Sequence, residues 1–185
     1  MNIIDRAIIF ATKAHEGQFR KATTIPYITH PYAVGIILQK ENYSDEVIAA
    51  GILHDTLEDT ETSLKELEEQ FGLHIAKLVF AASEEDKTLS WEERKQHTID
   101  ALPHADIEEI QIIVADKLHN LRSIRTDLEM YGEVTWERFN RGKSYQSWYY
   151  RNIAQALLPR KKDCRLIHKL EEEVHAVFGT FENEN

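Results

Sequence analysis

The 185-residue sequence is poor in the residues that mark several common classes of protein. Its one cysteine, Cys164, cannot form a disulfide within the chain or build a cysteine cluster for zinc, so an oxidising compartment is not expected. Seven glycines and four prolines are few for a loop-rich all-β chain. No apolar run approaches the ~18 residues of a membrane span, and the N-terminus carries no cationic leader. We therefore expect a cytoplasmic protein with no membrane partner.

Positive charge is also scarce. The chain has 22 lysines and arginines against 32 aspartates and glutamates, which gives a formal net charge of −10 with neutral histidines. This balance excludes a general basic surface for nucleic acid, so no nucleic-acid partner is expected. Hydrophobic residues at 42% and charged residues at 29% are ordinary for a globular protein of this length with its own core.

Apolar residues recur at helical spacing along almost the whole chain, and no run of strict alternation indicates a strand. We predict helix starts at Pro31, capped by His30, and at the capping box formed by Ser90 and Glu93. A helix is predicted to end at Gly72. The pattern predicts an all-α fold, a helical bundle of about nine to ten helices.

The sequence shows no repeat, no Ser/Gly linker and no shift in composition, so we expect a single domain. This domain is predicted to span residues 1–180, with the chemistry-bearing motifs in 1–125 and further helices in 126–180. Residues Tyr131 to Gly142 look like a connection with one short helix. The polar residues 181–185 are expected to form a frayed tail.

The densest chemistry lies at the end of one apolar helical pattern, where His54 and Asp55 are followed by Glu58 and Asp59. On a continuous helix these four side chains crowd one end of one face. Carboxylates gathered at a helix C-terminus repel each other and oppose the helix dipole, and a divalent metal ion would resolve this repulsion. The alternative is a solvated helix end.

Two more residues place polar groups in apolar helical patterns. His30 lies at a predicted helix start, and Asp116 lies deep in the apolar run from Ile110 to Leu121. A buried aspartate needs a charged partner because burying it alone is costly. Both residues are therefore candidate ligands of the same metal. The alternative for Asp116 is a buried ion pair with lysine or arginine.

Several separated motifs resemble a known family. In chain order they read AHEGQFRK from Ala14, PYITHP from Pro26, LHDTLEDT from Leu53, FG from Phe71 and ADKLHNLR from Ala115. The order His30, His54-Asp55, Asp116 matches the H…HD…D pattern of the HD superfamily of metal-dependent phosphohydrolases. The flanking motifs resemble the hydrolase domain of the RelA/SpoT group, which removes the 3′-pyrophosphate of the alarmone (p)ppGpp. The resemblance covers roughly residues 1–125 and implies a bundle of the HD-domain type in a small stand-alone hydrolase.

The resemblance implies one divalent metal ion, held by His30, His54, Asp55 and Asp116. Two imidazoles and two carboxylates form a mixed nitrogen and oxygen site that suits Mn²⁺, Fe²⁺, Co²⁺ or Zn²⁺. The family usually implies Mn²⁺.

The resemblance also implies catalytic and substrate-binding residues. Glu58 and Asp59 match the family's acidic pair, which activates the attacking water. The residues that match its nucleotide-binding segments are Arg20, Lys21, Asn120 and Arg122. Guanidinium groups suit a phosphate, and Asn120 follows Asp116 by one helical turn, so it is expected to face the same site. Without the motif, Arg20 reads as part of an ordinary solvated loop.

Residues 136–151 concentrate cations and aromatics in an otherwise acidic chain. We predict that Lys143 binds phosphate and that Tyr145, Trp148 and Tyr149, which recur at helical spacing, pack in the core. The alternative is that this segment closes over the nucleotide with its aromatics on the base.

Two histidines beside the motifs are given no role as ligands. His15 is expected to order the loop that follows it through a hydrogen bond, and His119 is expected to be a surface or packing residue.

The predicted partner is a small phosphorylated nucleotide, first of all (p)ppGpp. The loop Ala22 to Ile25 lacks the glycine that relatives commonly carry there, so the base preference stays open. One alternative is a phosphatase or phosphodiesterase for another nucleotide, such as an adenine alarmone or an NADPH-like compound. A second is a nucleotide-binding regulatory module without catalysis. No oligomeric state is predicted.

Overall fold

The computed structural model describes residues 1–83 and 88–179, and no β-strand occurs among these residues. The α-helices are α1 (Ile3–Ala14), α2 (Thr29–Lys40), α3 (Asp45–Leu53), α4 (Thr56–Asp59), α5 (Leu64–Phe71), α6 (Leu73–Ala82), α7 (Trp91–Ala101), α8 (Ile107–Tyr131), α9 (Gly142–Leu157) and α10 (Leu166–Phe178). Three 3₁₀-helices are η1 (Leu102–His104), η2 (Gly132–Arg138) and η3 (Leu158–Arg160). The predicted all-α fold is confirmed.

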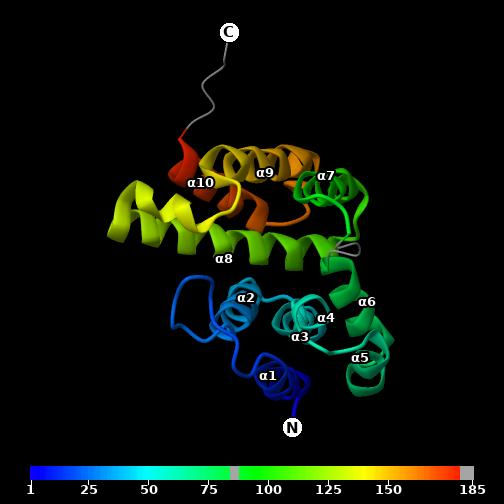
Figure 1. Ribbon diagram of the computed structural model, residues 1–185. Coiled ribbons are helices and arrows are strands. Elements are labelled where there is room, and N and C mark those ends of the chain that lie inside the picture. The colour runs from blue at the N-terminus through cyan, green and yellow to red at the C-terminus, as the bar shows by residue number, and fades with distance from the viewer. Residues whose placement is uncertain (84–87, 180–185) are drawn as a thin grey trace.

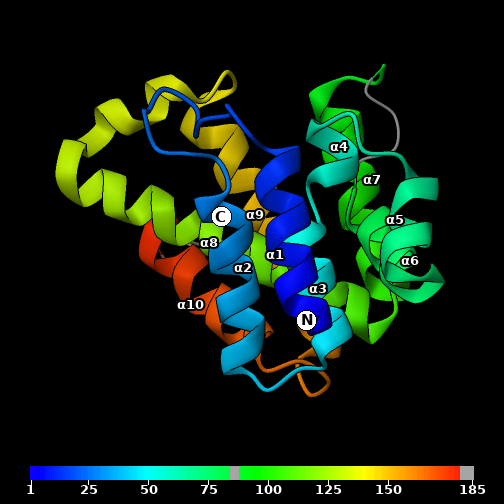
Figure 2. The ribbon, with the colours of Figure 1, turned by 90° about the horizontal axis from the view of Figure 1, so that it is seen from below.

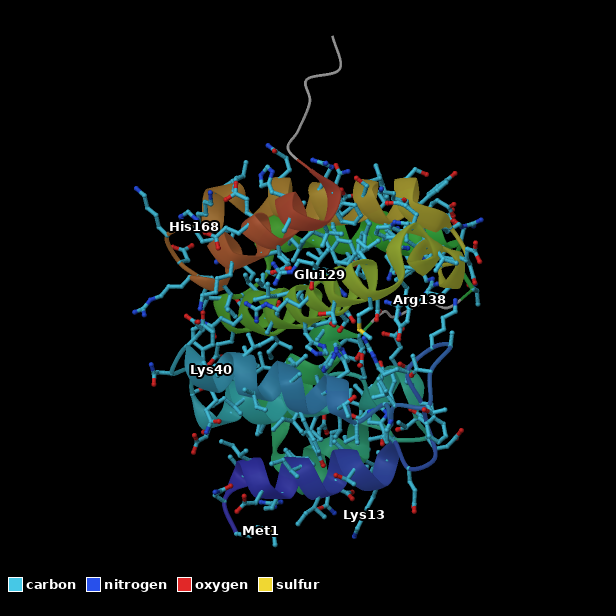
Figure 3. The ribbon with its side chains drawn as sticks, turned by 90° about the vertical axis from the view of Figure 1, so that its left-hand side faces the viewer. Met1, Lys13, Lys40, Glu129, Arg138 and His168 are labelled. Atoms are coloured by element: carbon cyan, nitrogen blue, oxygen red, sulfur yellow. The ribbon has the colours of Figure 1, made fainter. Side chains whose placement is uncertain are left out.

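Helix α8 separates two layers of helices. In Figure 1 the helices α1 to α6 lie below it, and α7, α9 and α10 lie above it. Figure 3 shows the same order from the side, with the orange-red α10 above α8 and the blue α1 at the bottom. Below α8, helix α3 packs against α1, α2 and α6, and Figure 2 shows this layer from beneath. The middle helix therefore contacts both halves of the chain.

Burial follows from this arrangement. The side chains of Val114, Leu118 and Leu121 on α8 are fully buried, because neighbours cover α8 on opposite sides. Contacts to α2, α3 and α6 come from one layer, and contacts to α10 and η2 come from the other. Asp116, near the centre of α8, is thereby largely removed from bulk water.

Two glycines allow α2 and α3 to approach closely. A Cβ atom added to Gly35 would lie 2.6 Å from Ile52 Cγ1, and one added to Gly51 would overlap the side chain of Leu38. The missing side chains let the two helix backbones lie nearer than larger residues would allow. This contact matters for function because α2 carries His30 and the end of α3 leads into His54.

The helix ends test several sequence predictions. The capping box of Ser90 and Glu93 is present, and Gly72 ends α5 with a positive φ of 85°. The prediction that His30 caps a helix is wrong, since α2 begins at Thr29 and its capping residue Ile28 makes no side-chain hydrogen bond. His30 thus lies inside the first turn, where its imidazole is available to the core.

The domain limits stay predictions. The end of the motif-bearing segment at residue 125 falls inside α8, so it marks no break in the structure. The predicted connection from Tyr131 to Gly142 contains η2. The predicted tail, residues 181–185, lies outside the described residues. Among the helices that are described, none combines the length and the apolar character needed to cross a bilayer.

Substitution of Gly35 by alanine should destabilise the fold. Overpacking typically costs about 1–3 kcal/mol, which exceeds the about 1 kcal/mol that alanine gains over glycine in a helix. We expect Gly35→Ala to lower the free energy of unfolding by about 1 kcal/mol, with a fall in Tm of roughly 2–4 °C. Denaturant and thermal unfolding measure the change. A variant more stable than the parent would contradict the close contact with Ile52.

Candidate active site

Four elements bring the H…HD…D residues together at the centre of the molecule. His30 is the second residue of α2, His54 follows the last residue of α3, Asp55 precedes α4, and Asp116 lies in the middle of α8. The exposed fractions of His30, His54 and Asp116 are 2%, 2% and 8%. Residues far apart in the chain thus form one buried polar cluster.

The two imidazoles face the two carboxylates through the same ring atom. His30 Nε2 lies 3.1 Å from Asp116 Oδ1 and 3.5 Å from Asp55 Oδ2. His54 Nε2 lies 3.1 Å from Asp55 Oδ2 and 3.8 Å from Asp116 Oδ1. One ligand atom from each of His30, His54 and Asp116 falls within 4.8 Å of the others. This mixed donor set fits a divalent metal ion.

The segment around His54 differs from the continuous helix expected from the sequence. Helix α3 ends at Leu53, and the short α4 begins only at Thr56. On an unbroken helix, adjacent residues point about 100° apart. From the turn between the two helices, His54 Nε2 faces the carboxylate of Asp116, and Asp55 Oδ2 faces the imidazoles of His30 and His54.

The outer nitrogens of both histidines have partners. His54 Nδ1 lies 2.8 Å from the carbonyl oxygen of Gly51 and donates to it, which leaves Nε2 as the ligand atom. His30 Nδ1 lies 2.7 Å from His119 Nδ1, so one of these two nitrogens donates to the other. His119 packs against His30 with ring centroids 4.9 Å apart, but it does not point aside from the site as expected. It supports the orientation of His30.

The sequence suggests two roles for Asp116, a metal ligand and a member of a buried ion pair, and its contacts fit both. Its Oδ1 atom faces the histidines, and its Oδ2 atom accepts a hydrogen bond of 2.7 Å from the ammonium group of Lys117. Asn120 Nδ2 also donates to Oδ1 at 2.6 Å, as expected for a residue one turn further along the helix. The carboxylate is thus a candidate ligand and a member of a buried ion pair together.

Burial and neighbouring charges shift the pKa values of the residues in this cluster. Burial alone would raise the pKa of Asp116, but Lys117 and the two histidines hold it well below its usual range. Burial lowers the pKa of His30. Burial also lowers the pKa of His54, but the charge and hydrogen bond of Asp55 outweigh this and raise it to about 9. A metal ion at Nε2 of His54 would take the place of that proton.

Tyr27 is a residue of the site that the sequence reasoning quoted in a motif but gave no role. Its hydroxyl donates to Asp55 Oδ2 at 2.7 Å and lies 3.4 Å from Asp59 Oδ2. Burial and the charge of Asp55 raise the pKa of Tyr27, so the hydroxyl keeps its proton and stays a donor. Tyr27 therefore connects the candidate metal ligands, which we call the metal cluster, to the acidic pair Glu58 and Asp59.

The cluster opens into a chamber of about 740 Å³. The acidic pair Glu58 and Asp59 on α4 lines this chamber together with the candidate metal ligands. A second cleft of about 600 Å³ lies beside it, and both spaces are lined by Tyr27 and Asn120. We call these two spaces the metal chamber and the basic cleft.

Four of the five predicted substrate-binding residues line the basic cleft: Arg20, Lys21, Asn120 and Arg122. Arg20 Nη2 donates to Asn120 Oδ1 at 3.2 Å and lies over the ring of Tyr27. Lys21 Nζ donates to Asn140 Oδ1 at 3.0 Å. The cleft therefore carries four cationic side chains, those of Arg20, Lys21, Arg122 and Arg138, in a protein of net charge −10, and Arg138 is ion-paired with Asp127, which also lines the cleft.

The structure does not bring Lys143 to this group. Its ammonium lies 3.0 Å from Glu133 Oε1, and Lys143 lines neither the metal chamber nor the basic cleft. The neighbouring aromatics Tyr145, Trp148 and Tyr149 form ring contacts of 6.0–6.1 Å with Trp91 on α7. Tyr149 is buried in the core as predicted, whereas Tyr145 is 44% exposed, so the predicted core position is wrong for Tyr145.

The loop after α1 is ordered as expected. His15 Nδ1 lies 2.8 Å from Gln18 Oε1, and Gln18 Nε2 donates to the carbonyl oxygen of Asp59 at 2.6 Å. These contacts connect the loop between α1 and α2, which we call the substrate loop, to Asp59 of the acidic pair.

Comparison with known proteins identifies the family to which this helical architecture belongs. The family model described as HD domain matches residues 7–138, which is more than half of the chain. The chain belongs to the HD-domain family. The match reaches from α1 to the end of η2 and so includes every element that carries the polar cluster.

Relatives of this HD domain share much of its length. The chain is 38% identical over 125 residues to guanosine-3′,5′-bis(diphosphate) 3′-pyrophosphohydrolase MESH1 of Danio rerio, covering 66% of this chain and 69% of the relative. A solved structure of lmo0812 from Listeria monocytogenes is similar with a TM-score of 0.76 and 38% identity, over 82% of this chain and 99% of that one. A metazoan ortholog of SpoT that hydrolyses ppGpp is similar with a TM-score of 0.81 and 27% identity, over 97% and 98%.

Removal of one imidazole tests the metal site. We expect His54→Ala to lose bound divalent metal, because two imidazoles and nearby carboxylates act together on one ion. Metal content is measured by mass spectrometry after reconstitution and desalting. His74→Ala is the control, since His74 is exposed and ion-paired with Glu108. Full metal content in His54→Ala would contradict this assignment.

Proposed function

We propose that this HD domain is a metal-dependent hydrolase of (p)ppGpp that releases the 3′-pyrophosphate by attack of water. The observation that supports it most is the position of the acidic pair Glu58 and Asp59 in one chamber with the buried cluster of histidines and aspartates. The chamber adjoins a basic cleft suited to a nucleotide. The similarity to 3′-pyrophosphohydrolases supports the same substrate.

His30, His54, Asp55 and Asp116 are the residues that would hold the metal, and we propose Mn²⁺ as the ion, with Fe²⁺, Co²⁺ or Zn²⁺ as alternatives. When bound, the ion supplies positive charge to the phosphate and lowers the pKa of water. His54 Nδ1 donates to the carbonyl oxygen of Gly51, and His30 Nδ1 shares a hydrogen bond with His119 Nδ1, so the Nε2 atoms of both imidazoles stay directed at the site.

The acidic pair handles protons in this proposal. Glu58 accepts the proton of the attacking water, and Asp59 assists at the leaving oxygen. Tyr27 keeps the carboxylates of Asp55 and Asp59 at fixed positions because its hydroxyl lies between them. Burial and the charge of Asp55 raise the pKa of Tyr27, so its protonated hydroxyl is the donor that orients these acids.

Cationic side chains would bind the substrate on two sides. In the basic cleft, the guanidinium groups of Arg20 and Arg122 suit phosphate oxygens, and Asn120 suits a ribose hydroxyl or a base. In the metal chamber, Lys117 and Lys95 line the wall and offset the charge of the phosphates. An anionic nucleotide is thus compatible with an acidic protein.

The base preference belongs to the same proposal. Ala22 in the substrate loop has a positive φ of 59°, a conformation that glycine adopts more easily. The loop therefore keeps the backbone shape that favours glycine while it carries a methyl group. We propose guanine as the base and retain adenine counterparts as the alternative. We also propose a cytoplasmic location, on the single cysteine and the lack of long apolar runs.

A nucleotide panel tests the function. The Mn²⁺-reconstituted protein is incubated with ppGpp, pppGpp, their adenine counterparts and NADPH, and the products are separated by chromatography. We expect GDP and pyrophosphate from ppGpp. Turnover of another nucleotide with none of ppGpp would favour the alternative phosphatase or phosphodiesterase. Binding without any turnover would favour a regulatory module.

Substitution of Glu58, the proposed general base, should separate catalysis from metal binding. We expect Glu58→Gln to retain metal and to lower kcat by a factor on the order of 10² or more, as for loss of a general base. Initial rates and metal content are measured on the same preparations. Glu61→Gln is the matched control, because Glu61 is an exposed carboxylate just beyond α4. An unchanged kcat in Glu58→Gln would refute the role of the pair.

A further inference from the structure

A buried carboxylate on the last helix lies behind the basic cleft. Glu173 is on α10, and its exposed fraction is only 7%. Helix α10 packs along α8, as Figures 1 and 3 both show. Burial of a single carboxylate is costly unless cations compensate it. Glu173 therefore needs positive partners on the face of α8 that it meets.

Two arginines of α8 supply the positive charge. Arg125 Nε lies 2.8 Å from Glu173 Oε1, and Arg122 Nε lies 3.7 Å from Glu173 Oε2. Each arginine thus approaches a different oxygen of the same carboxylate. The three charges sum to +1, so the cluster keeps one positive charge that Glu173 does not neutralise.

Arg122 has a second environment that Arg125 does not share. It lines the basic cleft with Arg20 and Asn120, whereas Arg125 is absent from the lining of that cleft. Its Nε atom is the one that approaches Glu173, and a guanidinium carries further N–H donors on its terminal nitrogens. Arg122 therefore lies within ion-pair range of α10 through Nε, and its terminal nitrogens carry donors that suit an anion in the cleft.

We propose that Glu173 is a positioning residue that holds Arg122 for the phosphate groups of the substrate. The inference rests on the proposed function of the basic cleft. Glu173 does not touch the substrate and acts only through the guanidinium of Arg122. A long, exposed arginine loses conformational freedom when it binds an anion, and an ion pair that already restrains it reduces this loss. Glu173 thus increases substrate affinity and does not change the rate of the chemical step.

A double-mutant cycle tests the link. Steady-state kinetics with ppGpp and Mn²⁺ are measured for Glu173→Gln, Arg122→Met and the double variant. We expect Glu173→Gln to raise KM by roughly 3–10-fold with kcat within about twofold of the parent, as for loss of binding that is equal in ground and transition states. In the Arg122→Met background the same change should leave KM unaltered, because the two residues act as one unit.

A matched control and a fold measurement accompany the cycle. Glu172→Gln changes an exposed carboxylate one residue away on α10 and should leave KM at the value of the parent. Thermal unfolding of every variant identifies loss of folded protein. A purely structural role for Glu173 would lower kcat and the folded fraction together and would act equally in both backgrounds, which would overturn the proposal.

Binding of GDP separates this inference from the proposed function. GDP lacks the 3′-group, so its affinity for the Mn²⁺-loaded protein, measured by calorimetry, does not depend on turnover. If the parent does not hydrolyse ppGpp, the proposed function fails, while weaker GDP binding in Glu173→Gln alone still supports the positioning role. Equal KM and equal GDP affinity in the parent and in Glu173→Gln would overturn it.

Discussion

The carboxylate of Asp116 is the group on which the site depends. It lies at the centre of the longest helix, where neighbours cover α8 from two sides. One of its oxygens faces His30 and His54, and the other accepts a hydrogen bond from Lys117. Burial of this charge would be unfavourable without these partners. The first turn of α2 and the end of α3 therefore have to meet α8 at this level, and the close approach of α2 and α3 allows it.

Charge is divided between two neighbouring spaces. The metal chamber holds the candidate ligands and the acidic pair, whereas the basic cleft carries Arg20, Lys21 and Arg122. Tyr27 and Asn120 line both spaces, and each contacts an aspartate of the metal cluster. A phosphorylated nucleotide can thus lie across the boundary with its scissile group toward the acids. The net charge of −10 describes the whole chain and hides this local separation.

Local patterns predicted the elements well. Helical spacing and end signals such as Gly72 identify an all-α chain, because helix formation depends on neighbours three and four residues apart. The same spacing predicted that Asn120 would face the site with Asp116, which the structure confirms. The spacing does not predict the break between Leu53 and Thr56, because His54 and Asp55 keep right-handed helical backbone angles and no glycine or proline marks the point.

The sequence by itself determined the helical class, the helix carrying Asp116, and the order of the histidines and aspartates along the chain. The tertiary structure decided which side chains support them. His119 contacts His30 across 89 positions, and Glu173 reaches Arg125 from a different helix. Lys143, which the cation-rich composition of residues 136–151 assigns to the substrate, binds Glu133 instead. Such contacts depend on how helices pack in three dimensions, and no spacing within a single helix encodes them.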